Sequence, residues 1–135
     1  MKKTKRQKGQ SLVEFALLLP ILLIIMAGVL DLGRLYYTYV AVTDAAAEGA
    51  SYASRHPNAS TETITAWAQA SSGGLINLEQ DGTVEVIRPS LMYGDPITVS
   101  VSYSYTVATP FIQAMFPGGQ FPLRAVASEV ILTAP

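Results

Sequence analysis

The first third of the chain is dominated by an uninterrupted apolar run. No charged residue occurs from Phe15 to Leu30, and eleven of these sixteen residues are Leu, Ile, Val or Phe. A helix from Leu12 to Leu30 is about 28 Å long at ~1.5 Å per residue, close to the ~30 Å hydrocarbon thickness of a bilayer. Pro20 removes one intrahelical hydrogen bond, which membrane helices tolerate when the freed carbonyl finds another partner. The pattern predicts a membrane-spanning segment over about residues 12–34.

The helical pattern continues past this segment to His56-Pro57, where proline favours a helix end. Small side chains recur every four residues in the second half, at Ala41, Ala45, Gly49 and Ala53. Such a stripe lets another backbone approach closely, although alanine is also simply the best helix former. The sequence therefore predicts one long helix over residues 10–56. Its stripe of small side chains serves either close packing or helix propensity alone.

Charged and aromatic side chains follow directly after the apolar run. Asp31 and Arg34 are three residues apart and can pair on one helical face. Tyr36, Tyr37 and Tyr39 lie where the helix leaves the predicted span. They suit an interfacial aromatic belt, and packing on the body is the alternative.

Residues 57–135 have the alternation of a small sheet domain. Apolar and polar residues alternate from Ile97 to Val107, which predicts a strand with one buried face. Two more strands are predicted over about residues 83–88 and 123–133, and turn residues separate all three. The expected fold class is α+β, with the long helix covering one face of an antiparallel meander sheet.

A short helix is predicted between the long helix and the first strand. Ser60 is a suitable N-cap residue, and Ile64, Trp67 and Ala68 fall on one helical face. A shared apolar face of this kind makes the predicted helix amphipathic.

The net charge of −1 conceals a strong asymmetry. Residues 1–8 carry five cations, whereas the rest of the chain has four arginines against ten acidic residues. Basic residues on one side of a span favour a cytoplasmic N-terminus, with the C-terminal body exported. This distribution argues against a nucleic-acid binder. The chain has no cysteine, which excludes disulfides and thiolate metal sites.

A cleaved secretory signal peptide is the competing explanation of the apolar run. Its small-residue cleavage site should follow the apolar core promptly. Instead Asp31-Leu32-Gly33-Arg34 follows, and the nearest alanine cluster, residues 45–47, comes about four helical turns later. The sequence favours a retained anchor.

No catalytic constellation is visible in the sequence. The single histidine, His56, precedes Pro57 at the expected helix end, and there is no nucleophile elbow or phosphate-binding glycine loop. Asp44 and Glu48 are four residues apart, but two acids without a histidine make a poor metal site, so a solvated acidic face is favoured. We expect no enzymatic activity, no cofactor and no small-molecule substrate.

The segment from Gly9 to Phe15, between the basic cluster and the apolar run, carries the most specific signal. Glu14 is a lone carboxylate at the edge of the apolar run, and an isolated charge in lipid is costly. The block Gly9 to Leu17, with Leu19-Pro20 and the later Asp31-Leu32-Gly33-Arg34, resembles the N-terminal signature of TadE-like proteins. The segment Ala45-Ala46-Ala47-Glu48-Gly49-Ala50, followed by Tyr52-Ala53, resembles the continuation of that signature.

TadE-like proteins are minor pilins or pseudopilins of the tight-adherence (Flp-type) pilus systems of bacteria and archaea. The resemblance covers roughly residues 8–56, while the body is similar only in its general run of strands. It implies a pilin-like fold and a single-pass protein of the cytoplasmic membrane. It also implies partners: pilin or pseudopilin subunits, the pilus assembly machinery and a prepilin peptidase.

The resemblance further implies roles for individual residues. The peptidase would cut after Gly9, which makes residues 1–9 a cytoplasmic leader and Gln10 the methylatable first residue of the mature chain. Glu14 would neutralise the α-amino group of a neighbouring subunit, and two charges in lipid are both relieved by pairing. Phe15 stands where Flp-type major pilins commonly have tyrosine, and it keeps the aromatic ring.

The alternative for this segment needs no processing. Gly9 is then a flexible hinge, and Glu14 snorkels to the membrane surface. The chain is in that case an uncleaved single-span protein that tethers an exported binding module.

Overall fold

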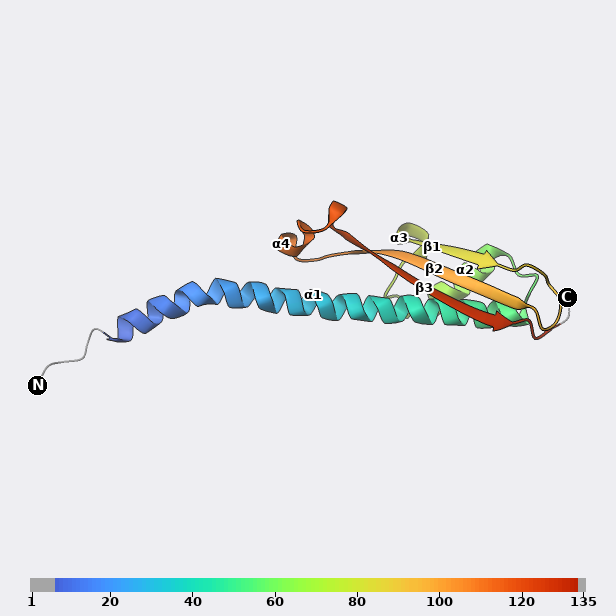
Figure 1. The fold of residues 1–135 in the computed structure, drawn as a ribbon, viewed down its shortest axis with the longest axis horizontal. Helices are drawn as coiled ribbons and strands as arrows, with labels where there is room; N and C mark the ends of the chain where they lie inside the picture. The colour runs from blue at the N-terminus through green and yellow to red at the C-terminus, as the bar shows by residue number, and fades with distance from the viewer. Residues whose placement is uncertain (1–6, 134–135) are drawn as a thin grey trace, which may run out of the picture.

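The structure, a computed structural model, describes residues 7–133 of the chain. The basic residues before Gln7, on which the predicted orientation depends, lie outside the described residues. Helix α1 runs from Gln7 to Arg55, with Pro20 inside it, and ends directly before His56-Pro57 as the sequence predicts. Its N-terminal half extends away from the rest of the molecule, and its C-terminal half lies along the body (Figure 1).

The body contains one sheet of three antiparallel strands in the order β1-β2-β3. Strand β1 spans Gly82–Ile87, β2 spans Pro96–Thr106 and β3 spans Gln120–Val130. The predicted α+β class and meander topology are confirmed. Strand β3 begins and ends about three residues before the predicted bounds of 123–133, and Pro122 within it pairs with Ser104. An edge strand accommodates this proline, since its missing N–H faces away from the ladder.

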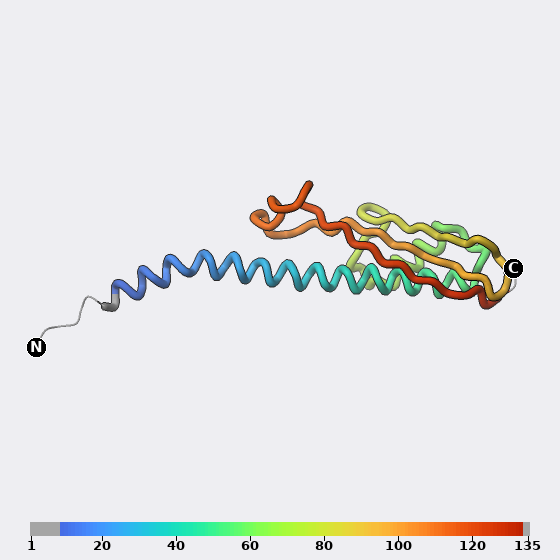
Figure 2. Tube along the Cα trace, viewed as in Figure 1, coloured from blue at the N-terminus to red at the C-terminus, as the bar shows by residue number. Residues whose placement is uncertain are grey.

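The core lies between the C-terminal half of α1 and one face of the sheet (Figure 2). The alanines of the small stripe are buried against Ile97, Val99 and Val101 of β2, which are fully buried. A Cβ atom at Gly49 would lie only 3.2 Å from Val99 Cγ1. The small stripe therefore brings the sheet of the same chain close to the helix backbone, and the close partner is intramolecular.

Helix α2, Thr61–Ser71, packs beside α1 at the same end. The Ser60 side chain accepts the Thr63 N–H at 3.3 Å, which confirms the predicted N-cap. Ile64 and Ala68 are fully buried, whereas Trp67, on the same side of the helix, is 52% exposed. The Trp67 ring stacks instead on Tyr52 with centroids 4.9 Å apart, and this contact covers only one ring face.

The connection between β2 and β3 lies against α1 near Gly28 and Asp31. It contains α4, Pro110–Gln113, and the short helix η1, Pro117–Gly119, and we call residues 107–121 the β2–β3 tip. The tip extends beyond the rest of the sheet toward the N-terminal half of α1 (Figure 1). The remaining short helix, α3, spans Leu78–Asp81 and comes directly before β1.

Candidate assembly site on the N-terminal helix

The protruding half of α1 has no protein cover. Among the described residues, one helical segment, Gly9–Arg55, is long and apolar enough to cross a membrane. Its most apolar window has a mean hydropathy of 2.6, and none of that window is buried. An exposed apolar surface of this size is not stable in water, so lipid or other subunits must cover it.

Gly9 and Gln10 lie in the first turn of α1. A Cβ atom added at Gly9 would have no neighbour within 4 Å, so packing inside this chain does not require glycine there. The first four N–H groups of a helix lack intrahelical partners. Gly9 and Gln10 therefore lie in the turn of α1 with the fewest intrahelical N–H donors.

Glu14 lies one turn further along the exposed helix. The Gln10 Nε2 donates a hydrogen bond of 3.1 Å to Glu14 Oε1, so the helix brings these two predicted site residues together. Phe15, the next residue, is 58% exposed. A neutral amide satisfies one hydrogen bond but supplies no positive charge, so a carboxylate in lipid still requires a cation.

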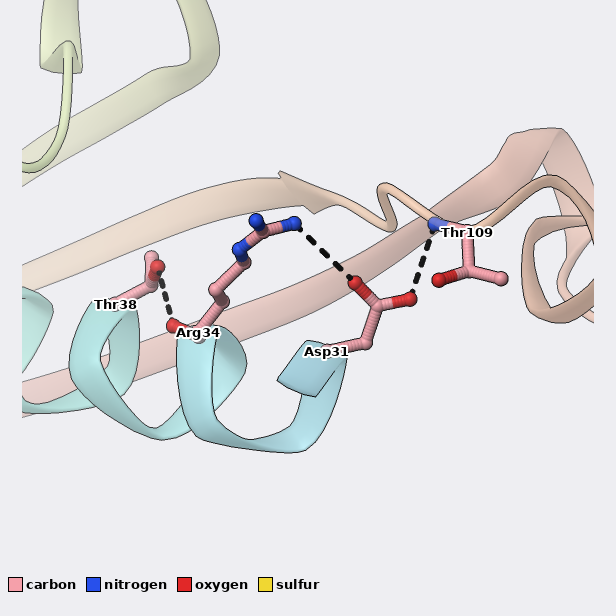
Figure 3. Close-up of polar contacts among 4 residues, drawn as sticks. All are labelled: Asp31, Arg34, Thr38 and Thr109. Atoms are coloured by element: carbon pink, nitrogen blue, oxygen red, sulfur yellow. Dashed lines mark hydrogen bonds and ion pairs between the residues drawn. The ribbon is translucent and has the colours of Figure 1, made fainter. Parts of the chain in front are cut away.

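A second polar cluster lies where α1 meets the β2–β3 tip (Figure 3). Asp31 is only 6% exposed, and its Oδ2 accepts the backbone N–H of Thr109 at 3.0 Å. Its Oδ1 has no hydrogen bond and lies 3.9 Å from Arg34 Nη1, which confirms the predicted pairing of these residues. The Thr38 hydroxyl donates to the Arg34 carbonyl at 3.0 Å.

The bond from Asp31 to Thr109 joins residues 78 positions apart, and no pattern in the sequence predicts it. Tyr105 lies in the same region, and desolvation raises the pKa of its hydroxyl, with a further rise from the Asp31 carboxylate. Tyr105 therefore stays neutral at physiological pH. This cluster fixes the tip onto α1 without leaving an unpaired charge.

The remaining candidate residues lie apart from both clusters. Tyr36, Tyr37 and Tyr39 are exposed, so packing on the body does not account for them. Asp44 and Glu48 are also exposed, as a solvated acidic face requires. Within residues 7–133 there is no group of three or more His, Cys, Asp or Glu that would hold a metal ion. His56 is an exposed residue after the last turn of α1, and its Nδ1 lies 3.1 Å from the Tyr52 carbonyl.

Comparison with known proteins gives one match. The family model described as TadE-like protein matches residues 9–51, a segment that lies entirely in α1 and includes Glu14 and Asp31. No curated protein and no solved structure matches the chain. The match confirms the resemblance over this segment and links the chain to tight-adherence pilus systems. Together with the exposed apolar helix, it supports a membrane-anchored protein.

Proposed function

From the TadE-like match over residues 9–51, we propose that the chain is a structural minor pilin or pseudopilin of a tight-adherence pilus system. Its N-terminal helix crosses the cytoplasmic membrane once, with the N-terminus in the cytoplasm and the body exported. The five cations among residues 1–8 support this orientation. The chain works with pilin or pseudopilin subunits and the assembly machinery, and it catalyses no reaction.

The observation that carries the proposal is the position of the block from Gly9 to Phe15. It lies at the end of α1 farthest from the body, on a helix whose apolar surface is exposed. A membrane tether needs neither a glycine free of packing constraints nor a carboxylate in this position. Both features serve a processed subunit whose helix packs against other helices of the same kind.

In this proposal a prepilin peptidase cuts between Gly9 and Gln10 and creates a new α-amino group. Glu14, exposed one turn away, then accepts the charged amine of a neighbouring subunit. Each charge alone is costly in the hydrocarbon layer, and pairing removes most of the cost for both. The same interaction sets the axial offset between adjacent helices, because it fixes which residues face one another.

Substitution of Glu14 tests this function directly. Glu14→Leu should reach normal levels in the membrane, since the substitution makes the helix more apolar. Piliation should fail, because removing one partner of a buried charge pair typically costs ~3–5 kcal/mol. Glu14→Gln retains the side-chain shape without the charge, and it should fail as well.

Val13→Leu is the matched control on the same exposed turn, and it should support normal piliation. Pilus assembly is measured by electron microscopy of cells that carry each variant as their only copy. Normal pili in cells with Glu14→Leu would reject the pairing role. The better account would then be an uncleaved anchor that tethers an exported binding module.

A further inference from the structure

The β2–β3 tip contacts α1 inside the predicted membrane span. Ile112 Cδ1 lies 3.5 Å from the position that a Cβ of Gly28 would occupy. The hydrogen bond from Thr109 to Asp31 fixes the tip one turn further along the helix. Gly28 is six residues inside the end of the predicted span at residue 34, which corresponds to about 9 Å at ~1.5 Å per residue.

This depth holds under a stricter boundary as well. If the hydrocarbon layer ends at Leu30, the last apolar residue before Asp31, the contact at Gly28 is still ~3 Å below its surface. The interfacial layer adds roughly 5–7 Å on each side of the bilayer. A body held this closely to α1 therefore brings its tip into the membrane surface wherever the helix spans the bilayer.

The chemistry of the tip suits that environment. No charged residue occurs between Asp95 and Arg124. Phe111 and Met115 are 62% and 72% exposed, and nothing in the body covers them. Large apolar side chains on a neutral segment are typical of elements that enter the interface.

Many backbone N–H groups of the tip already have hydrogen-bond acceptors within the protein. The N–H groups of residues 113–116 donate to carbonyls within the tip, Val107 donates to Gly119, and Thr109 donates to Asp31. Pro110 and Pro117 have no N–H to satisfy. Unpaired backbone groups are costly in lipid, so this internal bonding lowers the cost of insertion.

A groove of about 550 Å³ separates the tip from α1. Its walls are almost wholly apolar and include Ile25, Val29 and Leu32 from α1 and Ile112, Phe116 and Phe121 from the tip. The groove extends from Leu35 and Tyr105 past Asp31, which also lines it, and continues along the exposed apolar face of α1. Its occupant must therefore be apolar and must reach it from the surroundings of that helix.

We propose that the β2–β3 tip is a second membrane-contacting element, whose apolar side chains enter the interface and whose groove accepts phospholipid acyl chains. The inference rests on the proposed membrane-spanning role of α1. The tip holds the body at a fixed height and tilt on the membrane, since two contacts restrict the rotation that a single helix allows. The Asp31 cluster maintains the geometry by joining the tip to the span.

Tryptophan quenching by brominated lipids tests this inference on the full chain. The protein is reconstituted at low density into vesicles of phosphatidylethanolamine and phosphatidylglycerol, with or without phosphatidylcholine brominated on its acyl chains. Trp67→Phe removes the single native tryptophan and keeps a ring against Tyr52. Met115→Trp then reports on the tip. Met92→Trp is the matched control, because Met92 and Met115 are 71% and 72% exposed and Met92 lies before β2 at the other end of the strand.

A third variant, Leu19→Trp, reports on α1 itself. We expect brominated lipid to cause a loss of fluorescence for Met115→Trp and Leu19→Trp, with no change for Met92→Trp. Quenching at Leu19 without quenching at Met115 would overturn the tip proposal and leave the anchor intact. No quenching at either position would overturn both.

Two other results would also overturn the inference. A blue-shifted but unquenched Met115→Trp would mean that protein, such as a second copy, covers the tip. Equal quenching of Met92→Trp would mean that the whole body adsorbs to the vesicle without a specific contact. If the Trp67→Phe background does not fold, spin labels on Met115→Cys and Met92→Cys in this cysteine-free chain measure the same depths.

Discussion

Gly49 offers the sharpest test of how the small stripe on α1 is used. A Cβ at this position would lie 3.2 Å from Val99 Cγ1, 3.5 Å from Ala68 Cβ and 3.6 Å from Ile64 Cγ2. All three neighbours are fully buried, so they have little room to move aside. Gly49→Leu adds four carbon atoms where the first one is already tightly surrounded.

Two opposing effects decide the size of the change. Replacing glycine inside a helix stabilises it by about 0.8–1 kcal/mol. Overpacking a close-packed core typically costs about 1–3 kcal/mol, and sometimes more. Since the side chain of leucine extends well beyond its Cβ, we take the upper part of that range and expect a net loss of about 2 kcal/mol.

Gly33→Leu is the matched control, because it lies on the same helix with no atom within 4 Å of its Cβ position. It should leave stability unchanged or raise it by up to ~1 kcal/mol. Urea unfolding of the full chain in detergent micelles, followed by Trp67 fluorescence, measures both variants. With a slope of about 1–3 kcal/mol per M, Gly49→Leu should lower the midpoint by roughly 1 M. A midpoint equal to that of Gly33→Leu would refute intramolecular use of the stripe and favour packing against another subunit.

Two further substitutions examine contacts between distant parts of the chain. Arg88→Met should lower the free energy of unfolding by about 1–3 kcal/mol in the same urea assay, because Arg88 Nη1 donates to the carbonyls of Pro57 and Ala59 at 2.6 and 2.9 Å. An unchanged midpoint would mean that these bonds add nothing to stability. Asp31→Ala should speed amide hydrogen exchange in the β2–β3 tip, since it leaves the Thr109 N–H without its acceptor. Asp31→Asn keeps an acceptor and should preserve most of the protection, and equal exchange in both variants would show that the bond does not hold the tip.

Local patterns in the sequence predict most of the architecture. The His56-Pro57 step predicts the end of α1, because proline and the residue before it disfavour the helical conformation. The alternation from Ile97 to Val107 predicts β2, because the side chains of a strand alternate between its two faces. Both signals depend only on neighbours along the chain.

Features that depend on distant residues could not be predicted in the same way. The sequence marks Asp31 as a partner of Arg34, but only the fold brings Thr109 to the other carboxylate oxygen. The spacing of the small stripe does not show whether the helix packs there against Val99 of its own chain or against another subunit. Trp67 has the helical spacing of Ile64 and Ala68, but the sequence does not predict that its ring stacks on Tyr52 of α1.

The proposed functional residues of α1 differ from these features, because their partners lie outside the chain. The structure brings Gln10 and Glu14 together through helical spacing, which the sequence already contains. Their proposed roles concern a peptidase and a neighbouring subunit, which are separate molecules. Such roles are indicated by residues that the packing of their own chain does not explain. Gly9, which has no packing neighbours, and the carboxylate of Glu14 beside an apolar run are examples.

The mass of the protein extracted from membranes tests the central claim most directly. After co-expression with the cognate prepilin peptidase, the chain should have lost residues 1–9 and should carry a methyl group on Gln10. Gly9→Leu should remain at full length, whereas Gly33→Leu, at another glycine without neighbours around its Cβ position, should be processed normally. A full-length, unmethylated chain in the presence of active peptidase would contradict the account of a processed pilus subunit.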